Sequence, residues 1–124
     1  MTTKKIVQPS LDDSIQMLKA FADPVRLRLL NLLSQDMEIC VCHLHEALAL
    51  PQPTVSRHLA YLRKHGLVIG RKEGLWVHYR LARSTSGLNR ILLGCLDSCL
   101  GDPKIFAEDL IKLGSAISCC GGKI

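Results

Sequence analysis

The sequence has no long hydrophobic run and no linker. Within its 124 residues there is no stretch of roughly 18 apolar residues, which is what a membrane-spanning helix needs. The first ten residues lack the apolar centre of a signal peptide, and no repeat or Gly/Ser-rich segment divides the chain. We therefore expect a single cytosolic domain over residues 1–124, with no membrane partner, whose six cysteines are reduced thiols.

Positive charge is concentrated in one segment of the chain. The formal net charge of the whole sequence is +5. Residues 51–83 carry seven cations and one anion, a sum of +6, so the remaining residues sum to −1. A basic segment that holds all of the net charge is typical of a surface that binds a polyanion such as double-stranded DNA.

Hydrophobic periodicity predicts a mainly helical fold with one β-hairpin. Apolar residues recur at helical spacing, Asp23-Pro24 separates the first two helices, and a tight connection at 49–52 joins two helices of helix-turn-helix dimensions. The period then changes to two, which predicts a hairpin that turns at Glu73-Gly74. The predicted order, ααααββα plus a C-terminal helix, is a winged helix-turn-helix. Its parts are dimerisation helices at 11–22 and 86–117, the helix-turn-helix at 40–66, the wing at 67–82 and a flexible tail with cysteines at 118–124.

One face of the second helix in this pair is polar. If Val55, Leu59 and Leu62 face the core, the opposite face presents guanidinium, ammonium, hydroxyl and imidazole groups, as a recognition helix requires. A charged face can also be simply solvated, and we expect Trp76 and Tyr79 of the hairpin to pack rather than to stack on bases. The residues expected to contact DNA are Gln52, Thr54, Ser56, Arg57, His58, Tyr61 and Lys64 in the helix and Arg71 and Lys72 at the wing tip.

Four blocks of sequence resemble the ArsR/SmtB family of metal-responsive repressors. They begin at Phe21 (FADPVRLRLL), Ile39 (ICVCHL), Gln52 (QPTVSRHL) and Gly74 (GLWVHYRL), and they follow the family's order. The resemblance implies a winged-helix homodimer that binds a palindromic operator and pairs through its first and C-terminal helices. It also implies a repressor that has an inducer rather than a permanent cofactor.

Cys40 and Cys42 stand at the start of the first helix of the helix-turn-helix. Their Cys-Val-Cys sequence resembles the inducer-binding box of the arsenite-sensing branch. Thiolates are the ligands that soft ions such as As(III), Sb(III), Cd(II) and Hg(II) prefer. Residues two apart point to different sides of a helix, so we expect both thiols to reach one ion only outside regular helix. Ion capture should therefore distort the helix start and release DNA. The alternative is a pair of small buried apolar residues.

The third ligand of the ion is left open by the sequence. The family's box often has a third cysteine where this chain has His45, and an imidazole is a poor ligand for arsenite. Cys119 and Cys120 are adjacent thiols that could supply the ligand, or their tail is unused. Cys95 and Cys99 continue an apolar stripe, so we expect them to pack at a dimer interface. The predicted metal ligands are Cys40, Cys42, Cys119 and Cys120, with As(III), Sb(III) or a methylated arsenical as inducer.

Two other functions compete with arsenite sensing. A repressor of the same fold could respond to Hg(II), to Cd(II) or to oxidation of its thiols. An enzyme such as an arsenate reductase or a thiol oxidoreductase is not expected. No cysteine is followed within a few residues by an arginine that would close an anion loop, and the sequence has no Cys-x-x-Cys.

Overall fold

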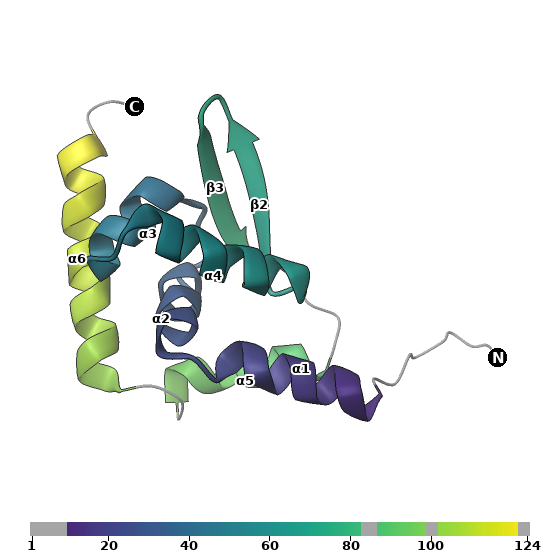
Figure 1. Cartoon of the computed structure of the whole chain (residues 1–124). Coiled ribbons are helices and arrows are strands. Elements are labelled where there is room, and N and C mark those ends of the chain that lie inside the picture. The colour runs from purple at the N-terminus through teal and green to yellow at the C-terminus, as the bar shows by residue number, and fades with distance from the viewer. Residues whose placement is uncertain (1–9, 83–86, 99–101, 122–124) are drawn as a thin grey trace.

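The computed structural model describes residues 10–82, 87–98 and 102–121. Helices dominate these parts of the chain, and short strands form one antiparallel sheet (Figure 1). The elements are α1 (Leu11–Phe21), α2 (Pro24–Leu33), β1 (Ile39–Cys40), α3 (Val41–Leu48), α4 (Gln52–Lys64), β2 (Val68–Glu73), β3 (Trp76–Leu81), α5 (Gly87–Ser98) and α6 (Pro103–Gly121). Among the described residues, no helix combines the length and the apolar character needed to cross a membrane.

Side-chain caps determine where the first two helices begin. The Ser10 hydroxyl accepts a hydrogen bond from the Asp13 N–H, and the Asp13 carboxylate accepts one from the Ser10 N–H, which makes a capping box for α1. The Asp23 carboxylate accepts from two N–H groups in the first turn of α2, where Pro24 needs no partner. The break predicted at Asp23-Pro24 is confirmed.

The hydrophobic core lies between α2, α3, α4 and α6. Four leucines of α2 are fully buried, together with Leu44 of α3 and Leu59 of α4. α6 packs along α3 and against α2. An ion pair with a buried carboxylate joins α6 to α2, because both oxygens of Asp109 (2% exposed) accept from the partly exposed Arg28 guanidinium at 2.8 Å. α1 and α5 lie together at the end of the molecule opposite the wing (Figure 1).

The sheet has the strand order β1-β3-β2, and the hairpin of β2 and β3 forms the wing. β1 was not predicted, because two residues are too few to show the period of a strand. The hairpin turns at Gly74-Leu75 rather than at the predicted Glu73-Gly74, since Glu73 still pairs with Trp76. Gly74 takes the positive φ of 63° that the turn requires. The predicted winged helix-turn-helix is confirmed, with this additional strand.

α6 is longer than predicted. It begins at the expected place, where the Asp102 side chain accepts from the Lys104 N–H at 2.9 Å. The helix then continues to Gly121, so residues 118–121 are helical rather than part of a flexible tail. No proline interrupts this stretch, and the first consecutive glycines are at 121 and 122. Residues 122–124 lie outside the described part of the chain.

Candidate DNA-binding face and thiol pair

A tight turn between α3 and α4 sets the orientation of the second helix. α3 ends at Leu48, and its C-cap residue Ala49 takes the left-handed conformation with φ 57°. The Leu50 N–H donates to the His45 carbonyl at 3.1 Å, and Nδ1 of the His45 ring donates back to the Leu50 carbonyl at 3.1 Å. His45, which replaces the family's third cysteine, therefore stabilises the turn of the helix-turn-helix.

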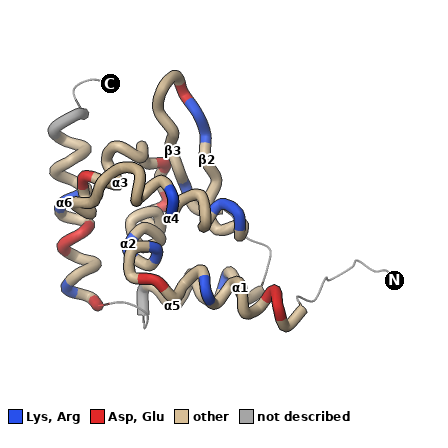
Figure 2. The backbone as a smooth tube through the Cα atoms, viewed as in Figure 1, with Lys and Arg blue, Asp and Glu red and all other residues tan. Residues whose placement is uncertain are grey.

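The outward face of α4 carries most of the residues predicted to contact DNA. Val55, Leu59 and Leu62 are fully buried, as predicted, so the opposite side of the helix faces solvent. Figure 2 shows lysine and arginine positions both on α4 and on β2 of the wing. DNA contact by these residues remains a prediction. On this side the predicted residues are Gln52, Arg57 and Lys64, which are exposed, and Thr54 and Ser56, which are half-buried.

His58 and Tyr61 hold α4 against α2 instead of projecting away from the domain. Nδ1 of His58 lies 3.4 Å from Arg26 Nη1 and 3.9 Å from Asp23 Oδ1. The Arg26 guanidinium stacks over the Tyr61 ring, 4.1 Å from its centroid. Arg26 also donates to two carbonyls at the end of α1, so it joins three helices. Helical spacing placed both residues on the polar face because it could not show where α2 lies.

His65 ends α4 beside this cluster. Its ring meets the Tyr61 ring edge-on, with 4.6 Å between the centroids. Burial lowers the pKa of His65, and the positive charges of Lys64 and Arg26 lower it further. His65 is therefore neutral at physiological pH and adds no cation to the outward face.

The wing has an apolar tip and a basic strand. Tyr79 is buried, as predicted, but the prediction that Trp76 packs is wrong, because its side chain is 51% exposed. Leu75, in the turn, is 92% exposed. Lys72 is exposed on β2, and its contact with a DNA phosphate remains a prediction. The apolar tip lies next to the predicted DNA-binding residues and was not identified from the sequence.

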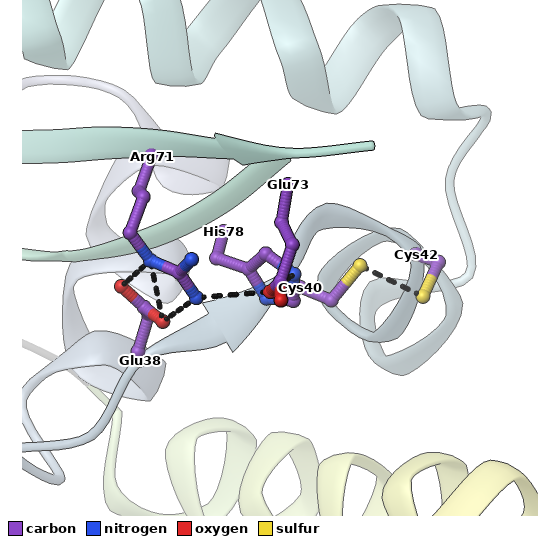
Figure 3. Close-up of polar contacts among 6 residues, drawn as sticks. All are labelled: Glu38, Cys40, Cys42, Arg71, Glu73 and His78. Atoms are coloured by element: carbon purple, nitrogen blue, oxygen red, sulfur yellow. Dashed lines mark hydrogen bonds and ion pairs between the residues drawn. The ribbon is translucent and has the colours of Figure 1, made fainter. Parts of the chain in front are cut away.

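Arg71 is bound by acidic side chains (Figure 3). Its Nη2 donates to Glu38 Oε1 at 2.6 Å and its Nε donates to Glu38 Oε2 at 3.0 Å. A second carboxylate, that of Glu73, also contacts Arg71, with Oε1 3.2 Å from the same Nη2. Hydrogen bonding to the guanidinium lowers the pKa of Glu38, and bonding to the carboxylates raises the pKa of Arg71. Glu38 was missed in the sequence because it is 33 residues from Arg71 and precedes an unpredicted strand.

Cys40 and Cys42 form a thiol pair at the start of α3 (Figure 3). Cys40 is the N-cap residue, with extended backbone at φ −68° and ψ 142°, and Cys42 lies in the first turn. Their Sγ atoms are 3.1 Å apart. Because a soft ion bonds each thiolate at about 2.3 Å, two thiolates on one ion are separated by at most ~4.6 Å. The two sulfurs are therefore already within range of a single ion.

This arrangement corrects the expectation that the helix start must open. Cys40 does lie outside regular helix, as the two-residue spacing required. The extended conformation belongs to β1, which pairs with β3, and it coexists with an intact α3. The two thiols therefore lie together without any turn of α3 having to unwind.

The other cysteines differ in position. Cys95 is a half-buried thiol on α5, and Cys99 lies outside the described residues. Cys119 and Cys120 belong to the last turns of α6, the helix that packs along α3. Among the described side chains, no group of three or more Cys, His, Asp or Glu residues is arranged to hold a metal ion. A third ligand for the pair is thus not assembled in this part of the structure.

Comparison with known proteins identifies the family. Residues 23–69 match the family described as bacterial regulatory protein, arsR family. The chain is 54% identical over 68 residues to the arsenical resistance operon repressor of Escherichia coli (strain K12), a segment that covers 55% of this chain and 58% of that repressor. The match thus spans less than two thirds of the length of this relative.

Solved structures share the fold of this chain. HlyU from Vibrio cholerae N16961 is 39% identical with a TM-score of 0.59, and the match covers 72% of this chain and 95% of that protein. The homodimeric winged helix-turn-helix DNA-binding domain of a possible ArsR-family regulator from Mycobacterium bovis is 33% identical with a TM-score of 0.59, covering 70% and 77%. The chain therefore belongs to the arsR family of bacterial regulatory proteins, which are DNA-binding helix-turn-helix regulators and not enzymes.

Proposed function

We propose that this chain is a transcriptional repressor that releases its operator when Cys40 and Cys42 capture As(III) or Sb(III). The observation that carries the proposal is the 3.1 Å separation of the two Sγ atoms at the start of the helix that supports α4. The choice of a metalloid is supported by the 54% identity to a repressor of arsenical resistance and by the preference of soft ions for thiolates.

The capture reaction is an exchange of ligands without a change of oxidation state. Arsenite carries three hydroxyl groups, and each thiol that binds forms one As–S bond. The hydroxyl leaves with the thiol proton as water. Two thiols therefore leave one hydroxyl on arsenic, and a third thiol would replace it. A monomethylated arsenical offers only two exchangeable groups, so the pair alone can saturate it.

Cys120 is the stronger candidate for a third thiol. It follows the buried Leu113 by seven residues and the buried Ala116 by four, and from this helical spacing we predict that it shares their side of α6. Because α6 packs along α3, which begins with the thiol pair, this face is on the side from which a ligand would come.

The main test compares operator affinity with and without As(III) in serine variants. Cys40→Ser and Cys42→Ser should bind DNA as the parent does and lose the As(III) response, because a hydroxyl is a hard, protonated ligand. Cys95→Ser, on α5, is the matched control and should respond normally. A normal As(III) response in the Cys40→Ser, Cys42→Ser double variant would overturn the proposal.

A second pair of variants tests the third ligand. Cys120→Ser should weaken the response to inorganic arsenite and keep the response to a monomethylated arsenical. Cys119→Ser serves as its neighbour control and should keep both responses. If Cys120→Ser responds to both ligands as the parent does, α6 supplies no thiol.

We also propose that the active form is a homodimer paired through α1 and α5. On α1, Leu11, Ile15 and Leu18 are 79%, 41% and 50% exposed, and Ile91 on the neighbouring α5 is 64% exposed. The M. bovis relative is a homodimer, and a small domain commonly covers such a surface with a second copy. Leu18→Glu should yield monomers in sedimentation analysis. A parent protein that is monomeric at micromolar concentration would contradict this proposal.

Redox sensing is a second candidate, favoured by the same sulfur distance. Two thiols 3.1 Å apart need little movement to form a disulfide in the presence of an oxidant. Titration with hydrogen peroxide, read out as operator affinity, separates the two functions. An arsenite sensor should release DNA with As(III) under reducing conditions, whereas a redox sensor should release it only with the oxidant.

A further inference from the structure

A chain of polar contacts connects the segment of the thiol pair to the wing. Glu38 lies two residues before Cys40, and its carboxylate holds the Arg71 guanidinium of β2 through contacts of 2.6 and 3.0 Å. Arg71 also contacts Glu73 at 3.2 Å, and Glu73 lies 3.6 Å from Nε2 of His78 on β3. Figure 3 shows these side chains gathered on one side of the sheet, with the Cys40–Cys42 pair next to them.

The backbone connects the same residues. Cys40 of β1 is paired with His78 of β3, and His78 is paired on its other side with Arg71 of β2. Residues directly opposite in antiparallel strands have their side chains on the same face. The carboxylate of Glu38 therefore reaches across β3 to bind β2, and a displacement of β1 acts on the wing through both backbone and side chains.

Resting on the proposed function, we propose that the Glu38–Arg71 ion pair couples ion capture at Cys40 and Cys42 to the position of the wing. Arg71 is then a positioning residue rather than a contact to DNA phosphate. Its guanidinium already makes a bidentate bond to a carboxylate, the geometry that phosphate would otherwise occupy. An ion bonded to both thiolates sets the position of Cys40 and therefore of β1, and Glu38 carries a displacement of β1 to the wing.

The location of this pair suits a coupling role. The Arg71 side chain is 50% exposed and that of Glu38 is 30% exposed, so the pair can break and reform without leaving a buried charge. The wing is a hairpin that extends from the domain (Figure 1), so its orientation depends on the contacts that its strands make with the rest of the chain. Glu38 and β1 contact the middle of these strands, at Arg71, His78 and Tyr79, from the segment that contains Cys40.

The test uses the full chain and three measurements on each variant. Loss of titratable thiols reports As(III) capture, fluorescence anisotropy reports operator affinity, and Trp76 reports the wing. Trp76 is the sole tryptophan of the sequence and lies on β3, two residues from His78. Its emission should change when As(III) binds the parent protein. Thermal unfolding confirms that each variant is folded.

Glu38→Gln should capture As(III) and bind the operator as the parent does, but its As(III)-induced loss of operator affinity should be smaller by roughly two- to fivefold. Its Trp76 response should fall in parallel. Adding Arg71→Gln should reduce the response no further, because both changes remove one interaction. The exchange of charges, Glu38→Arg with Arg71→Glu, should restore part of the response, which a phosphate contact could not do.

Two matched controls isolate the pair. Lys72→Gln removes the neighbouring exposed cation of β2 and should lower operator affinity equally with and without As(III). Glu46→Gln removes an exposed acid of α3 and should change neither value. A Glu38→Gln variant that captures As(III) and releases DNA as fully as the parent overturns the coupling role alone. A parent protein that captures no As(III) overturns the proposed function, and the coupling role with it.

Discussion

Within the described residues, two arginine–carboxylate pairs join distant parts of the chain, and their surroundings differ. Arg28 of α2 binds Asp109 of α6 through two bonds of 2.8 Å, and the Asp109 side chain is 2% exposed. Arg71 of β2 binds Glu38 with similar geometry, but both side chains are open to solvent. The first pair lies within the packed helices, whereas the second lies between a two-residue strand and the wing.

The difference separates a contact that stabilises the fold from one that can take part in a signal. Removing Arg28 leaves the buried Asp109 carboxylate without its partner and without water, so this pair fixes α6 against α2. The pKa of Arg28 is raised by its hydrogen bonds to Asp109, in spite of partial burial. Water can replace either partner of the Glu38–Arg71 pair at little cost. A contact that transmits a signal has to break and reform, which the exposed Glu38–Arg71 pair can do.

The largest expected effect comes from breaking the buried pair. Arg28→Met should lower the free energy of unfolding by about 3 kcal/mol, because Asp109 remains buried without its partner. Urea denaturation followed by circular dichroism measures this value. The double variant Arg28→Met, Asp109→Leu is the control and should recover most of the loss. If the single variant unfolds at the same urea concentration as the parent, the pair does not hold α6 in place.

The next effect concerns DNA recognition. Arg57→Ala should cost about 1–3 kcal/mol of preference for the operator over unrelated DNA, because Arg57 lies on the outward face of α4. Lys72→Ala should weaken binding to all sequences alike and reduce the dependence on salt. Anisotropy titrations at several salt concentrations measure both. An Arg57→Ala variant with the parent's preference would show that α4 does not read the sequence.

The smallest expected effect is on the stability of Glu38→Gln. Because the Glu38–Arg71 pair is solvent-exposed, its loss should leave the urea midpoint unchanged within error. This result, set beside a reduced As(III) response in the same variant, would separate signalling from stability. A large drop in the midpoint would place the exposed pair in the same class as Arg28–Asp109.

Sequence patterns predicted the features that depend on neighbours along the chain. The helix break at Asp23-Pro24, the buried stripe of Val55, Leu59 and Leu62, and the hairpin were all confirmed. Contacts between distant segments were not predictable in this way. The orientation of His58 toward α2 depends on where α2 packs.

The thiol pair illustrates the same limit at short range. Spacing identified Cys40 and Cys42 but predicted that the helix would have to open to bring them together. The strand β1 holds Cys40 extended beside an intact α3, and two residues give no periodic pattern from which such a strand could be inferred. Glu38 was missed because it comes just before this unpredicted strand and because its partner, Arg71, lies on another strand.

The most direct test of the account is whether As(III) and DNA affect each other's binding by the same factor. If As(III) lowers operator affinity about a hundredfold, a coupling of ~2.7 kcal/mol, linkage requires that the operator lower As(III) affinity a hundredfold as well. Thiol-exchange titration of As(III) against Cys40 and Cys42, with and without saturating operator, measures this factor. In the parent protein, we expect the operator to lower As(III) affinity by the same factor by which As(III) lowers operator affinity. In Cys42→Ser, we expect neither ligand to change the affinity for the other. An As(III) affinity that is the same on and off the operator would contradict it.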